Sequence, residues 1–208
     1  MSIVSVSTCR VVALACMWAS AVAAQPAAPP TAPAWDVSNG RAVVVCPLTI
    51  GGRFEAKTSA VTGRITVAGE ARELGGAFSV DLRSLDTGIA LRNQHLRDNY
   101  LEVSRGPGYD TAVLSELILD SPPPGPGRSA TVGFRGVLSL HGNGRPVTGT
   151  AHVTHKRETL EVRARFPLKI DAYEIARPSY LGVGVINQIE VDVRATLKPE
   201  AARPSGSR

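Results

Sequence analysis

The feature that most constrains the fold is a strict alternation of side chains between Leu160 and Ile170. Every second residue in this segment is apolar, and most of the residues between them are charged. Successive side chains of a β-strand point to opposite faces, whereas those of an α-helix repeat about every 3.6 residues. The pattern therefore predicts a strand with one dry face and one wet face.

Similar segments recur along most of the chain and predict an all-β protein. Apolar residues alternate with polar ones at 188–197 and again at 132–140. Shorter candidates for strands lie at 41–50, 53–60, 64–68, 77–83, 111–119 and 147–155. Together these segments give about eight strands.

Short turns between the expected strands predict that neighbouring strands run antiparallel. Gly51-Gly52, Gly75-Gly76 and residues 141–144 resemble hairpin turns, because glycine and asparagine adopt the backbone conformations that tight turns need. Parallel strands would need crossovers of about a dozen residues. Closure into a barrel is favoured, since it removes the unpaired edges that an open sheet would expose.

One segment lacks the alternation of apolar and polar residues, and its pattern predicts a short helical insert. Between Asp86 and Val103 the apolar residues lose strict alternation, and Asp86-Thr87-Gly88 offers side chains that can cap a helix. We expect the insert to lie over one end of the closed sheet.

The two ends of the chain are expected to lie outside the barrel. Residues 1–24 resemble a secretory signal, with an apolar run of 14 residues that is shorter than the ~20 needed to span a membrane. Residues 25–34 form an Ala/Pro-rich spacer, 35–197 the barrel and 198–208 a disordered tail. This organisation predicts a periplasmic protein without a stable membrane span. Cys16 fits a lipoprotein cleavage box poorly, so a lipid anchor is disfavoured.

The composition argues against several other classes of protein. The formal net charge is +5, but the basic residues are scattered singly, so no nucleic acid partner is indicated. After removal of residues 1–24 only Cys46 remains, and its apolar neighbours predict a buried position. His152 and His155 are three residues apart and would face opposite sides of a strand, so we expect no metal site there. No cofactor motif is present.

Five short sequence motifs, in order along the chain, resemble motifs of the YceI-like family. They are GGRFEAKT at 51–58 with VTG at 61–63, FSVDLRSLDTG at 78–88, RNQHLRD at 92–98 with YLEV at 100–103, GVLSLHG at 136–142, and PSYLG at 178–182. The resemblance covers about residues 35–197. The chain departs from the family pattern at 171–175. This departure affects the expected local shape of the cavity, but not the expected fold.

The resemblance implies an extended, lipocalin-like antiparallel barrel that holds a polyisoprenoid or quinone-like lipid and is not an enzyme. The inward positions expected to line its cavity are Phe54, Ala56, Phe78, Val80, Leu82, Phe134, Leu138, Val162, Ala164, Phe166, Leu168 and Val191. Small inward residues and few aromatic ones leave room for a ligand. Two alternatives stay open: a scaffold whose core is filled by side chains, and a barrel enzyme that acts on a lipid.

Three cationic residues of the insert, Arg92, His95 and Arg97, are candidates to meet the polar head of such a lipid. The alternative is that His95 and its neighbours cap the barrel by packing and hydrogen bonding. The sequence leaves open which lipid is bound and whether the protein forms a homodimer.

Overall fold

The computed structural model describes residues 33–67, 72–180 and 182–200, and most of them form strands. The main strands are β1 (Ala34–Pro47), β2 (Arg53–Thr58), β3 (Val61–Val67), β4 (Glu73–Asp81), β5 (Thr111–Leu119), β6 (Ser129–Leu140), β7 (Asn143–His155), β8 (Leu160–Lys169) and β11 (Gln188–Pro199). Two short strands, β9 (Ser179–Tyr180) and β10 (Val183–Gly184), form a separate ribbon. The expected signal peptide, most of the spacer and residues 201–208 lie outside the described residues.

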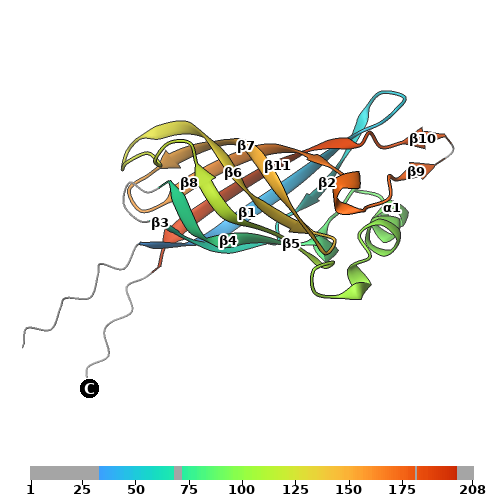
Figure 1. Cartoon of the computed structure of the whole chain (residues 1–208), viewed down its shortest axis with the longest axis horizontal. Coiled ribbons are helices and arrows are strands. Elements are labelled where there is room, and N and C mark those ends of the chain that lie inside the picture. The colour runs from blue at the N-terminus through green and yellow to red at the C-terminus, as the bar shows by residue number, and fades with distance from the viewer. Residues whose placement is uncertain (1–32, 68–71, 181, 201–208) are drawn as a thin grey trace, which may run out of the picture. The chain divides into compact units, whose positions relative to one another are not determined.

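The main strands form a closed antiparallel barrel with eight strand positions, which confirms the predicted fold class (Figure 1). The order of neighbours is β11-β8-β7-β6-β5-β4-β3-β1, and β1 pairs back with β11. The other edge of β1 pairs with β3 near its start and with β2 near its end. Strands β2 and β3 therefore share one position in the barrel wall.

The alternation that predicted β8 also decides which side chains point inward. Ala164 lies between Ala151 of β7 and Val193 of β11, so apolar residues form a continuous row inside the barrel. The neighbouring residue Arg163 points outward and pairs with the carboxylate of Asp192 at 3.0 Å. β8 thus separates a dry interior from a charged exterior.

One expected turn is wrong. Gly75 and Gly76 lie inside β4, where the pairing with β5 shifts register between Leu74 and Ala77. Gly76 has a φ of +89°, and a Cβ atom there would lie 2.1 Å from the carbonyl oxygen of Arg64. The two glycines therefore mark an irregularity in the strand, where the neighbouring backbone comes too close for a side chain. The turns at Gly51-Gly52 and at 141–142 lie between strands, as predicted.

The first and last strands are longer than the sequence pattern predicted. β1 begins at Ala34 and not near residue 41, because Trp35 pairs with Ile65 of β3 and with Pro199 of β11. β11 continues to Pro199, past the expected end of the barrel at 197. The amide of Glu200 donates to the carbonyl of Ala34 at 2.8 Å, so the two ends of the barrel chain lie side by side.

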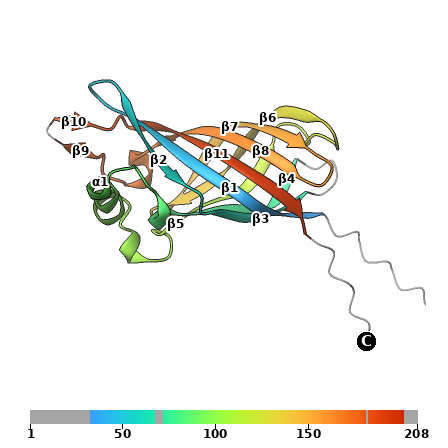
Figure 2. The ribbon, with the colours of Figure 1, turned by 180° about the vertical axis from the view of Figure 1, so that it is seen from behind.

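The segment between β4 and β5 is helical, as predicted. It contains η1 (Leu82–Ser84), α1 (Ala90–His95), the π-helical turn η2 (Leu96–Tyr100) and η3 (Val103–Arg105). A further turn, η4 (Asp171–Tyr173), follows β8. Both views place α1, the β9–β10 ribbon and the β1–β2 loop at one end of the barrel, and the start of β1 and the end of β11 at the other (Figures 1 and 2). We call the former the α1 end.

Close packing inside the barrel yields a prediction for Gly149 of β7. Gly149 lies opposite Phe134, and a Cβ atom would lie 2.3 Å from the carbonyl oxygen of Arg165 and 2.9 Å from the Phe134 ring. Gly149→Ala should lower the free energy of unfolding by about 1–3 kcal/mol, the usual cost of overpacking. Denaturant unfolding measures this change.

Gly144→Ala in the same strand is the matched control. Its Cβ would meet Val137 at 3.6 Å, an ordinary contact distance. We expect stability to be unchanged or raised by up to about 1 kcal/mol, because alanine restricts the unfolded chain more than glycine does. Equal effects of the two substitutions would contradict the packing described for Gly149.

Candidate ligand cavity

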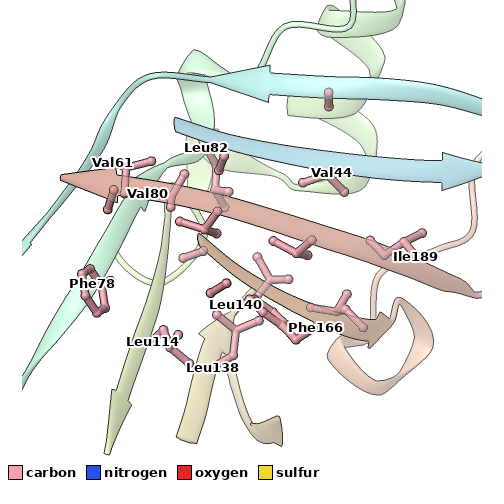
Figure 3. A pocket seen from close by; sticks show the side chains of 18 of the residues that line it. Val44, Val61, Phe78, Val80, Leu82, Leu114, Leu138, Leu140, Phe166 and Ile189 are labelled. Carbon is pink, nitrogen blue, oxygen red and sulfur yellow. The ribbon is translucent and has the colours of Figure 1, made fainter. Parts of the chain in front are cut away.

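An apolar cavity of about 250 Å³ runs through the inside of the barrel. All twelve positions predicted from the sequence lie on its wall. Figure 3 shows the side chains of Phe78, Val80 and Leu138 among those that surround it. An engineered protein cavity of about 150 Å³ stays dry and takes up benzene, so this space is large enough to bind an apolar group. That these residues hold a ligand stays a prediction.

The cavity exists because small side chains occupy inward positions of neighbouring strands. Ala56, Ala151 and Ala164 all lie on its wall. Val162 and Val191 also face inward, yet they are only partly buried, since the hollow interior leaves one side of each uncovered. The barrel is therefore not filled by its own side chains.

The cavity wall offers little polar chemistry. Cys46 and Tyr100 are the two lining residues of the described chain whose side chains carry a sulfur or an oxygen atom. Cys46 is a buried free thiol. Burial raises the pKa of Cys46 to about 11, against a smaller opposite effect of the positive charge of Arg92. The thiolate is therefore scarcely populated at neutral pH.

Sequence reasoning missed the residues that line the cavity at the α1 end. They come from the helical insert and from the segment after β8, and they are Leu85, Leu96, Tyr100, Leu101, Ile175, Pro178 and Val185. The leucines of the insert were visible as apolar residues without alternation. The residues after β8 gave no periodic signal, because they lie outside the long strands.

The three expected head-group residues make three different contacts, and none of them lines the cavity. The Arg92 guanidinium lies over the ring of Phe54, 4.6 Å from its centroid. Arg97 donates to the carbonyl oxygen of Leu85 at 3.1 Å. His95 is exposed. Arg92 is thus next to a cavity-lining ring, whereas Arg97 supports the backbone of the insert.

A carboxylate fastens the start of the insert. Asp86 accepts hydrogen bonds from the backbone N–H of Gly88 at 2.9 Å and from the amide of Asn93 at 2.7 Å. Its backbone also pairs in both directions with Lys57 of β2, at 2.8 Å. The turn before α1 is therefore tied both to the helix and to the barrel wall.

A buried histidine fastens the end of the insert. Nε2 of His141 lies 3.2 Å from the Glu102 carboxylate, and Nδ1 lies 3.0 Å from the carbonyl oxygen of Tyr173. Both Glu102 and His141 have positive φ, at 49° and 52°. Few residues other than glycine adopt this conformation, so the contacts hold two strained residues in place. His141 thereby joins the insert to η4.

The described residues contain no group of three or more side chains that could hold a metal ion. Nor does any helix among them have the length and apolar character to cross a membrane.

The hydrogen bonds of Asp86 predict a pH dependence. The bonds from Asn93 and Gly88 lower the pKa of Asp86 below its ordinary value, partly opposed by desolvation. A lowered pKa in the folded state stabilises the protein above the ordinary value and loses this effect as the pH falls through the folded pKa. The stability difference between wild type and Asp86→Asn should therefore be constant from pH 7 to 5 and shrink below about pH 4.

Denaturant unfolding across this pH range measures the difference. Asp98→Asn, which removes an exposed carboxylate of the same insert, is the control. An Asp86 difference that stayed constant below pH 4 would show that the charge does not hold the turn.

A closed antiparallel barrel with an apolar interior and a helical insert over one end defines a lipocalin-like protein. The model of the YceI-like domain matches residues 35–197, and the chain therefore belongs to the YceI-like family. No curated protein matches the sequence significantly.

Several solved structures are similar to this chain, and two of them illustrate the shared fold. One is a polyisoprenoid-binding domain from Saccharophagus degradans implicated in plant cell wall breakdown, with a TM-score of 0.63 and 16% identity. The match covers 80% of this chain and 98% of that one. The other is BcnA of Burkholderia cenocepacia, with a TM-score of 0.60 and 14% identity, covering 76% of this chain and 95% of that one.

Proposed function

We propose that the protein binds a long apolar lipid, of the polyisoprenoid or isoprenoid quinone type, inside its barrel. The observation that carries this proposal is the apolar cavity, whose wall is contributed by strands around the barrel and by the helical insert. The solved domain from Saccharophagus degradans, which has the same fold, is described as polyisoprenoid-binding. A linear tail suits a space enclosed along the length of a barrel.

The energy of binding would come mainly from the tail. Each CH₂ group moved from water into an apolar site contributes up to about 0.8 kcal/mol. An isoprenoid of several units can therefore bind tightly without specific polar contacts. The near absence of polar atoms on the cavity wall supports a larger contribution from the tail than from polar contacts.

We propose a carrier or sequestering protein in preference to an enzyme. Catalysis by proton transfer needs a group whose pKa lies near the working pH. The cavity wall offers the Cys46 thiol, with a pKa of about 11, and the hydroxyl of Tyr100. An apolar wall suits the holding of a lipid better than its chemical conversion. The expected signal at 1–24 supports a periplasmic site of action.

Filling part of the cavity should weaken binding without unfolding the barrel. Ala164→Trp places a large ring on the cavity wall between Val162 and Phe166. Loss of contact with even a few CH₂ groups should weaken the binding of a prenyl lipid at least about tenfold. Native mass spectrometry after incubation with the lipid measures the bound fraction, and thermal unfolding shows that the variant is folded.

Thr150→Trp is the matched control, because Thr150 is exposed on the outer face of the neighbouring strand β7. We expect it to bind like the wild type. If a folded Ala164→Trp variant retained wild-type affinity, the ligand would not occupy this cavity. Recovery of a chemically altered lipid would favour an enzyme.

The proposed head-group residues Arg92, His95 and Arg97 predict a difference between charged and neutral lipids. Arg92→Ala combined with Arg97→Ala should weaken a prenyl diphosphate by about 1 kcal/mol per lost charge pair, less at high salt, because exposed pairs contribute little. A neutral quinone should bind almost as before. Titrations of both ligands test this expectation.

Arg97→Ala alone is the control, since this residue bonds to the backbone of Leu85. Equal losses for both ligands in the double variant would show that the arginines support the insert and do not contact a head group.

A further inference from the structure

The α1 end of the barrel carries the exposed large apolar side chains of the described residues. They are Ile50, Ile89, Leu91 and Ile186, with exposed fractions of 72, 49, 61 and 42%. We call these four residues the apolar rim. Isolated apolar side chains are common on protein surfaces, but their concentration at one end of a molecule marks an interaction site.

The apolar rim is assembled from three segments that are distant in the sequence. Ile50 lies at the tip of the β1–β2 loop, beside Gly51 and Gly52. Ile89 and Leu91 lie at the start of α1, and Ile186 follows β10. The amide of Ile186 donates to the carbonyl of Pro47 at 2.9 Å, which ties this segment to the base of the β1–β2 loop. Figures 1 and 2 show the three segments at the same end.

The rim residues do not line the cavity, although their neighbours do. Phe54, Val185 and Leu96 belong to the same three regions of the chain and lie on the cavity wall. The rim therefore lies on the outer side of three regions that also contribute to the cavity wall. Binding of a lipid inside the barrel does not by itself require these outer side chains to be apolar.

The charged side chains within the three rim segments are all basic. Residues 47–54, 89–97 and 177–186 contain four arginines and one histidine, and no aspartate or glutamate. Glu55 follows the first of these segments, Asp86 and Asp98 flank the second, and Glu174 lies three residues before the third. Arg53, Arg92 and Arg177 thus give each segment at least one cation close to its exposed apolar residues.

We propose that the apolar rim is a docking surface for a lipid bilayer that contains anionic phospholipids. Apolar side chains on protruding loops can enter the boundary between head groups and acyl chains, while neighbouring arginines contact the phosphates. The rim residues are exposed on three separate segments, an arrangement that suits the deformable surface of a bilayer. Docking by this end would bring the cavity against the membrane.

Vesicle sedimentation tests the proposal with vesicles of phosphatidylcholine, with and without phosphatidylglycerol, and without any prenyl lipid. We expect the wild-type protein to bind the mixed vesicles more strongly than the neutral ones, and less strongly as salt is raised. Ile50→Ser combined with Leu91→Ser should weaken binding to the mixed vesicles about tenfold or more, because two apolar side chains no longer enter the bilayer.

Ile118→Ser combined with Val137→Ser is the matched control. Both residues are partly exposed and belong to the barrel wall in β5 and β6, outside the rim and outside the cavity lining. This variant should sediment like the wild type. Thermal unfolding of each variant confirms that it is folded before its binding is compared.

Three outcomes would overturn the proposal: no wild-type binding to either vesicle, equal binding by folded rim and control variants, or a wild-type dimer that the rim substitutions dissociate while vesicles stay unbound. The last result would make the rim a contact between two copies of the chain. Binding of a detergent-dispersed prenyl lipid, measured on the same rim variant, should match the wild type. Failure of docking and failure of cavity binding are thus distinguished.

Discussion

The pairing of β1 with β11 is the interaction on which the rest of the structure depends. It joins the first and last strands of the barrel along most of their length and closes the sheet on itself. Without it, the inward apolar side chains would face water on an open sheet, and no enclosed cavity would exist. The hollow interior is therefore a property of closure as much as of the residues that line it.

The sequence was most informative where one rule governed a whole strand. Alternation in β8 identified Val162, Ala164, Phe166 and Leu168 as inward residues, and all of them lie on the cavity wall. The prediction of a turn at Gly75 and Gly76 was wrong, because a pair of glycines is typical both of a turn and of an irregular strand. The close approach of the Arg64 backbone to Gly76 distinguishes the two, and it is visible only in the structure. Sequence reasoning also missed Ile175 and Pro178, whose positions depend on tertiary contacts and not on any repeat.

The cationic residues of the insert show a second limit of sequence reasoning. Arg92, His95 and Arg97 are close in the sequence, which suggested one shared role. In the structure Arg92 lies over Phe54, Arg97 bonds to the backbone of Leu85, and His95 is exposed. The direction of each side chain depends on the helical geometry of the insert, which includes a π-helical turn that no sequence pattern indicated.

The polar contacts that hold the two ends of the insert have a consequence for the kinetics of ligand exchange. If the proposed lipid entered or left at the α1 end, it would pass a segment held by Asp86 at its start and by the Glu102–His141 contact at its end. These few polar bonds can break locally while the barrel stays folded. The strength of binding would then be determined by the apolar wall, and the residence time of the lipid by how often these bonds open. Affinity and exchange rate could change independently, because different residues control them.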